Sequence, residues 1–227
     1  MMPNGDRFEA AYNKIAALLR KKVRGDRWLP FSSVVHEVAE NDATVRAIKD
    51  DLLQYGDLRN AIVHDRGKAP KVLADPRDDV VTRIEEIWDR LSRPRILRSL
   101  PRPVPLQFFD ASVLLQEPLS YMRENDFSQA IVFRNGKYVI LSTEGNAHWL
   151  ESKAKEDIIA LSEVQLSDVL ECEPKDTCVY LRANDSVDLA REIFANDIGK
   201  RVFSVLVSES GKAEGKPINI VTPWDFI

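Results

Sequence analysis

The apolar residues of the first ninety positions recur three and four residues apart, which is the spacing of amphipathic helices. This pattern predicts a helix over residues 6–24, a short helix that ends near Val38, a long helix from Asp42 to about Gly67, and a helix from Val80 to Leu91. We therefore expect residues 1–93 to form an all-helical bundle.

The helical pattern ends in a segment that is rich in proline and arginine. Four prolines lie between residues 94 and 105. Proline cannot continue a helix and favours extended backbone. We therefore expect residues 94–105 to be a semi-stiff linker between the helical domain and a second domain, residues 106–227.

Beyond the linker, short apolar runs alternate with helical stretches, and the pattern occurs twice. The first copy, about residues 106–150, has a helical stretch to Asp126, a strand over 130–133, an Asn135-Gly136 hairpin and the ending 140–146. The second copy, about residues 177–227, has a helical stretch to Asp197, a strand over 204–207, a hairpin at Gly211 and the ending 219–225. A connecting helix and loop occupy about residues 151–176.

A duplicated unit of this size predicts two small modules that bury their faces against each other. Each module is expected to be of a β-α-β-β-α type, because its strands alternate with helical stretches. Such a pair has two related clefts between the copies, so the duplication bears on ligand binding as well as on the fold.

Composition places the chain among globular proteins that lie outside membranes. Of its 227 residues, 44% are hydrophobic and 30% are charged, as in soluble domains. No apolar run approaches the ~20 residues that span a bilayer, and the N-terminus has no apolar signal segment. Two cysteines, Cys172 and Cys178, are too few for a disulfide framework. We expect a cytoplasmic protein with free thiols.

Charge divides unevenly between the two predicted domains. Residues 1–103 carry 20 Lys/Arg and 16 Asp/Glu, whereas residues 104–227 carry 12 and 20, so the halves have net charges of +4 and −8. This asymmetry indicates different partners for the two halves. The basic cluster from Arg20 to Arg27 either contacts a polyanion or is a solvated helix end whose cations suit the helix dipole.

Each copy ends with a strand that leads into a threonine and, three residues later, a polar side chain. These pairs are Thr143 with Asn146 and Thr222 with Asp225. A strand that runs into a helix start presents free N–H groups to a phosphate, and a carboxylate one turn later can accept from the two ribose hydroxyls. The same residues also suit helix capping, so the pattern alone leaves both interpretations open.

Together with the duplication, these residues make the second domain resemble a tandem CBS pair, or Bateman module. That family ends each copy with Gly-hydrophobic-hydrophobic-Thr-x-x-Asp. The second copy keeps Thr222 and Asp225 but has Asn219 at the glycine position. The first copy has Ile140 and Asn146 at the glycine and aspartate positions, and an amide carries no charge for ribose binding.

The resemblance implies that the pair binds an adenosine-containing ligand, namely AMP, ADP, ATP or S-adenosylmethionine, and regulates an attached domain. The expected site contains Thr222 and Asp225, with Thr143 and Asn146 at the related cleft and the adenine near Val179. No metal is expected, because no spacing of His, Cys and carboxylates is typical of a zinc site.

A charged residue falls within the apolar stripe of the predicted long helix. Arg59 lies near the middle of the stripe that begins at Val45, at ~100° per residue. Burial of an unpaired guanidinium is costly, so Arg59 must be paired, lie at an open edge or line a cleft. Asn60 and His64, four residues apart, share the adjacent face, so all three side chains are expected at one groove.

Arg59, Asn60 and His64 resemble the motif of the HEPN superfamily, whose members are small helical bundles. The resemblance implies a metal-independent ribonuclease that acts as a dimer. His64 would then transfer the proton and Arg59 would stabilise the phosphate charge. The residues leave two alternatives open, an inactive HEPN-like dimerisation domain and a structural role in which Arg59 pairs with an acid and His64 caps carbonyls.

The sequence thus predicts a mixed fold, with an all-helical HEPN-like bundle followed by an α/β tandem CBS pair. The predicted function is adenine-nucleotide sensing by a homodimer, with RNA as the substrate if the helical domain is catalytic. The alternatives are a non-catalytic interaction protein whose CBS scaffold binds no ligand, and a nucleic-acid-binding module that uses the basic first domain.

Overall fold

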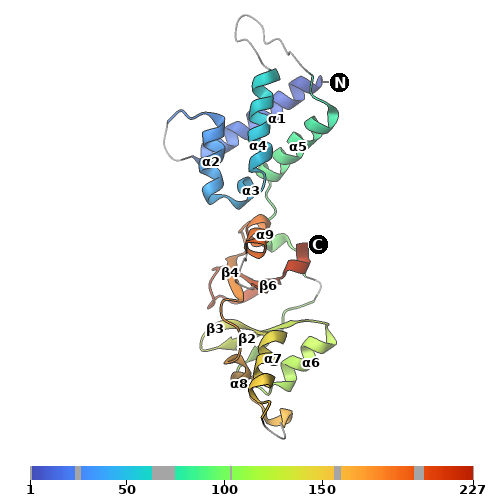
Figure 1. Ribbon diagram of the computed structural model, residues 1–227, viewed down its shortest axis with the longest axis vertical. Coiled ribbons are helices and arrows are strands. Elements are labelled where there is room, and N and C mark those ends of the chain that lie inside the picture. The colour runs from blue at the N-terminus through green and yellow to red at the C-terminus, as the bar shows by residue number, and fades with distance from the viewer. Residues whose placement is uncertain are drawn as a thin grey trace, which may run out of the picture. The chain divides into compact units, whose positions relative to one another are not determined.

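The computed structural model describes residues 2–23, 27–62, 75–102, 104–155, 160–196 and 202–226. The chain divides into two compact units, which are treated separately below. Unit 1 comprises Met1–Arg95 with Ser186–Leu189, and unit 2 comprises Ile96–Asp185 with Ala190–Ile227. Figure 1 shows helices in unit 1 and both helices and strands in unit 2.

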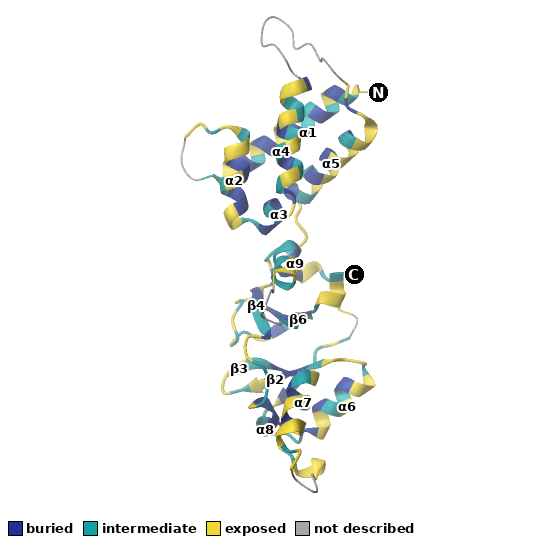
Figure 2. Cartoon of the chain, in the orientation of Figure 1, coloured by how far each residue is buried: buried dark blue, intermediate teal, exposed yellow. Residues whose placement is uncertain are grey.

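The main part of unit 1 is a bundle of helices around one apolar core. The helices are α1 (Asn4–Lys22), α2 (Phe31–Asn41), α3 (Ala43–Arg46), α4 (Lys49–Ile62) and α5 (Asp78–Ser92). The largest fully buried side chains of this core come from α1, α4 and α5, and they are Phe8, Ile15, Leu19, Leu52, Ile62, Ile84 and Ile87. Along α1 and α5, buried positions recur between exposed ones (Figure 2), as amphipathic helices require.

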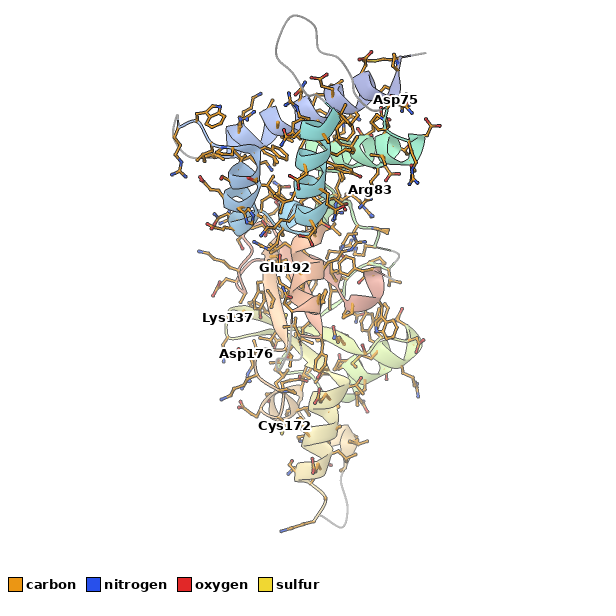
Figure 3. The ribbon with its side chains drawn as sticks, turned by 45° about the horizontal axis from the view of Figure 1, so that its top comes forward. Asp75, Arg83, Lys137, Cys172, Asp176 and Glu192 are labelled. Carbon is orange, nitrogen blue, oxygen red and sulfur yellow. The ribbon has the colours of Figure 1, made fainter. Side chains whose placement is uncertain are left out.

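Polar contacts join these helices at the rim of the core. The Arg7 guanidinium on α1 forms an ion pair with Glu85 on α5 at 2.6 Å. Arg83 of α5, labelled in Figure 3, forms one with Asp51 of α4 at 2.7 Å. These side chains are partly exposed, so solvent screens each pair and its contribution to stability is small. The bundle therefore depends mainly on its apolar core.

The long helix predicted from Asp42 is two helices. Asp42 caps α3 by accepting from the N–H groups of Thr44 and Val45, and the chain turns at Ala47 and Ile48 before α4 begins. Asp50 and Asp51 lie in the first turn of α4, where acidic residues stabilise a helix start. Periodicity alone does not reveal this break, because the buried residues Val45, Ile48 and Leu52 continue the helical spacing across it.

Unit 2 holds two copies of one arrangement. In the first copy, β1 (Phe108–Asp110) pairs in parallel with β2 (Gln129–Arg134), which pairs antiparallel with β3 (Lys137–Ser142). In the second copy, β4 (Cys178–Arg182), β5 (Ser204–Ser208) and β6 (Pro217–Val221) repeat this order. The helices are α6 (Gln116–Glu124), α7 (Thr143–Ser152), α8 (Leu166–Leu170) and α9 (Val187–Ala195), of which α9 belongs to unit 2 from Ala190 onward.

The two copies pack through the inner faces of their sheets. Ile131 and Ile140 of the first sheet and Leu206 of the second form one apolar cluster. The hairpins add polar contacts at one side. The Tyr138 N–H donates to the Ala213 carbonyl at 2.7 Å, and Lys137, labelled in Figure 3, lies 3.8 Å from Glu214. The predicted burial of one copy against the other is thus present.

The segment predicted as a linker is partly built into unit 2. Leu97 is fully buried, and its N–H donates to the Asp185 carbonyl at 3.0 Å. The Arg98 N–H donates to the Ala183 carbonyl at 2.9 Å. Proline content correctly excludes a long helix here, but it does not reveal that Leu97 has a place in the core.

Candidate functional site

Unit 2 contains a cavity of about 350 Å³ between the two copies. Its wall combines three segments that are distant in sequence. They are the proline-rich segment before the first copy, the residues that lead into β2 together with the start of β2, and the end of β6 with the residues that follow it. The residues that bear on its chemistry are Arg102, Leu106, Tyr121, Asp126, Phe127, Ile131, Asn219, Ile220, Thr222, Trp224 and Asp225. An apolar wall with a few polar groups is typical of small-molecule sites.

Thr222 and Asp225 lie together in this cavity. β6 ends at Val221, and the chain continues through Thr222 into a 3₁₀ helix, Pro223–Phe226. Asp225 Oδ2 accepts from the Thr222 N–H at 2.7 Å and from the Thr222 hydroxyl at 3.0 Å. Both bonds use the same oxygen, so the described residues leave the other carboxylate oxygen available to a ligand. The pair therefore forms a cap and can also present an acceptor to the cavity.

Asn219, at the glycine position of the resembled motif, has a structural role. It is buried, and its side-chain carbonyl accepts from the Ile220 N–H at 3.0 Å. Arg102, in the proline-rich segment before the first copy, donates to the Ile218 carbonyl at 2.6 Å. The edge of β6 at the cavity is thus covered by the segment that precedes the first copy.

The corresponding residues of the first copy are arranged differently. Ser142, not Thr143, caps α7, since its hydroxyl accepts from the Gly145 N–H at 2.9 Å. Asn146 Nδ2 donates to the Ser142 carbonyl at 2.9 Å, and Asn146 Oδ1 is buried without a partner in the described part of the chain. The Asn146 amide thus makes a hydrogen bond within the first turn of α7, and its predicted role in ribose binding stays a prediction.

A carboxylate from another segment lies at the start of α7. Glu173 accepts from the Ser142 N–H at 2.6 Å and from the Ser142 hydroxyl at 2.8 Å. Burial raises the pKa of Glu173, although these two hydrogen bonds oppose the shift. The local sequence does not reveal Glu173 because it follows α8, about thirty residues away.

Val179 lies on β4 and is not among the residues that line the cavity. Its neighbours Cys178 and Tyr180 pack on the cluster between the sheets. Because side chains alternate along a strand, Val179 is on the opposite face of the sheet. The apolar wall of the cavity comes instead from Leu106, Ile131 and Ile220.

Sequence reasoning missed Arg102, Asp126 and the residues of β2 that line the cavity. The duplication could have predicted that both copies line the site, because a cleft between two copies must be built from both of them. The motif at the end of one copy therefore implies lining residues from the other copy. The contribution of residues 94–105 was missed because this segment was interpreted as a linker outside both domains.

The proposed catalytic residues of unit 1 are only partly described. Arg59 on α4 is half-buried, and its Nε is buried without a hydrogen-bond partner among the described residues. The positive charge of Arg59 acts on Tyr12, whose pKa is nevertheless raised, mainly by burial. Asn60 is exposed. His64 lies outside the described residues, so the predicted groove stays a prediction.

Within the described ranges, no three His, Cys, Asp or Glu side chains form a group that could hold a metal ion. Among the helices of those ranges, none has the length and apolar character that crossing a membrane would need.

The solved structures to which this chain is similar include CBS domain pairs. No protein-family model matches the chain, and no curated protein matches it. The CBS domain pair of protein MJ0100, in complex with 5′-methylthioadenosine and S-adenosyl-L-methionine, is 13% identical. That match covers 59% of this chain and 93% of the other, with a TM-score of 0.43.

Two further solved structures are similar to a comparable degree. The CBS domain of a CBS-domain-containing membrane protein from Sphaerobacter thermophilus is 20% identical, covers 66% of this chain and 95% of its own, and has a TM-score of 0.45. CBSX2 in complex with AMP is 14% identical. That match covers 58% of this chain and 92% of the other, with a TM-score of 0.41. The structural neighbours are thus CBS domain pairs, and the HEPN resemblance of unit 1 stays a prediction.

Proposed function

We propose that unit 2 binds an adenosine-containing ligand in the cavity at Thr222 and Asp225 and that binding regulates the helical domain. One observation carries the proposal. A single cavity contains both motif residues together with apolar residues from the other copy. The free oxygen of Asp225 would accept from the ribose hydroxyls, and the adenine would pack between Leu106, Ile131 and Ile220.

A ligand in this position would contact both copies at once. It would therefore stabilise whichever arrangement of the copies fits it best, and this preference is what a regulatory equilibrium requires. The proposed assembly is a homodimer, as the resemblance implies. The alternative is a scaffold that binds no ligand and supports assembly alone.

Thermal unfolding with a panel of ligands tests the proposal. The panel contains AMP, ADP, ATP, 5′-methylthioadenosine and S-adenosylmethionine, which includes the molecules bound by two of the structural neighbours. A ligand that binds the folded chain raises the melting temperature increasingly with its concentration. The shift should disappear in Asp225→Ala and persist in Asn146→Ala, the matched variant of the first copy. A shift that survives in Asp225→Ala places the ligand elsewhere.

A ribonuclease in the helical domain is a second candidate, favoured by the buried and unpartnered Nε of Arg59. Such a group is costly unless a further partner, such as a phosphate, completes its hydrogen bonds. Arg59→Ala and His64→Ala should each abolish cleavage of RNA while circular dichroism shows unchanged helix content. Cleavage that persists in both variants would remove this candidate.

A further inference from the structure

The charges around the Thr222–Asp225 cavity are unfavourable for a phosphate. Among the described residues that line it, the ionisable side chains of fixed charge are Asp126, Asp225 and Arg102. Two carboxylates therefore face one guanidinium. Arg102 already donates to the Ile218 carbonyl at 2.6 Å. The lining charges thus sum to −1, which disfavours an added anion relative to a neutral or cationic group.

The backbone donor that would hold a phosphate is also engaged. The N–H and hydroxyl of Thr222 both donate to Asp225 Oδ2, at 2.7 and 3.0 Å. A phosphate at this position would have to replace that carboxylate oxygen and then lie beside it. Two anions in contact repel each other, so Thr222 contributes less to phosphate binding than the motif alone suggests.

The rest of the wall suits an uncharged or cationic group. Tyr121 and Phe127 line the cavity as an edge-to-face pair with ring centroids 5.6 Å apart. Trp224 lines it as well and is 78% exposed, so its ring is accessible to a ligand. Aromatic faces attract cations. A cavity of about 350 Å³ is also near the small end of the ~300–1,000 Å³ range of ligand sites.

We infer that the ligand of this cavity is an adenosine whose 5′ substituent is uncharged or cationic, not a phosphate. This inference rests on the proposed function and specifies the ligand class of the same site. The ribose would contact Asp225, and the uncharged or cationic 5′ substituent would lie near Asp126 and the aromatic rings.

Isothermal titration calorimetry with adenosine, 5′-methylthioadenosine, S-adenosylmethionine, AMP and ATP tests the inference. We expect adenosine and the two sulfur compounds, none of which carries a phosphate, to bind about tenfold or more tightly than AMP, and ATP to bind most weakly. Added salt should weaken S-adenosylmethionine binding and leave 5′-methylthioadenosine unchanged, because salt screens charges alone. Tighter binding of AMP or ATP would overturn the inference but leave the proposed function standing. Absence of binding by every compound would overturn both.

Asp126→Asn provides a sharper version of this test. Asp126 has a positive φ of 55°, a conformation that asparagine also tolerates, so the variant removes charge without adding backbone strain. The preference for S-adenosylmethionine over AMP should fall about threefold. Glu124→Gln is the matched control, since Glu124 is exposed and does not line the cavity. An equal fall in the control would assign the preference to overall charge and contradict the inference.

Discussion

Replacement of Gly145, in the first turn of α7, by alanine should destabilise the protein, whereas the same replacement in most helices stabilises it. Replacement of a helical glycine by alanine usually stabilises a protein by up to about 1 kcal/mol. Here a Cβ at position 145 would lie 1.9 Å from Glu173 Oε1 and 2.2 Å from Glu173 Cδ. The carboxylate must therefore move away in Gly145→Ala.

The expected loss of stability comes from the two donors of Ser142 that the Glu173 carboxylate no longer satisfies. The end of the Glu173 side chain can rotate away with little steric penalty, but the N–H and hydroxyl of Ser142 then lose their acceptor. Ser142 is 3% exposed, so water cannot easily replace it. Each unsatisfied donor costs about 1–3 kcal/mol. After the helix gain is subtracted, Gly145→Ala should destabilise the first copy by about 1 to 5 kcal/mol.

Urea unfolding gives the free energy, and hydrogen exchange of peptides that cover α7 locates the change. The control is a double-mutant cycle with Glu173→Ala. In the Glu173→Ala background, Gly145→Ala should be neutral or stabilising because no carboxylate remains to be displaced. If Gly145→Ala stabilises the chain in the presence of Glu173, the carboxylate does not occupy the start of α7 and the reasoning is refuted.

Three further predictions follow from buried groups of unit 2. Because burial raises the pKa of Glu173 above 4.5, its ionised form is disfavoured in the folded state. The wild type should therefore gain stability relative to Glu173→Gln as the pH falls through the raised pKa toward 4.5, which urea midpoints measured from about neutral pH down to about pH 4 will follow. Burial raises the pKa of Cys178 to about 11, so iodoacetamide at about pH 8 should modify it at least ~100-fold more slowly than in the urea-unfolded chain, as followed by mass spectrometry. Leu206 is 1% exposed between the sheets, so Leu206→Ala should cost about 2–5 kcal/mol in urea unfolding, and a loss below about 1 kcal/mol would show that the copies do not pack there.

Much of the fold could be predicted from the sequence because the relevant interactions are local. The spacing of apolar residues in α1 and α5 and the Asn135-Gly136 hairpin are properties of short segments. The two strands that open the copies, β1 and β4, are not marked by such a pattern. Each is held by parallel pairing with a distant strand, and that pairing is invisible in a window of a few residues.

The candidate site was predictable to the extent that it depends on the motif. Thr222 and Asp225 are three residues apart in sequence, so their proximity follows directly from the motif. Arg102 lies in the cavity wall although it is more than a hundred residues from Thr222 in sequence. Val179 does not line the cavity because side chains alternate along β4 and place it on the opposite face of the sheet. Asn146 has the right position in the motif, but its amide is turned toward Ser142. These outcomes depend on tertiary packing, which sequence spacing does not encode.

The most direct test of the central claim is a crystal structure of the protein with 5′-methylthioadenosine. The account predicts electron density between the two copies of unit 2, with the ribose hydroxyls within hydrogen-bonding distance of the Asp225 carboxylate. Density at Thr143 and Asn146 instead, or an empty Thr222–Asp225 cavity at saturating ligand, would contradict it.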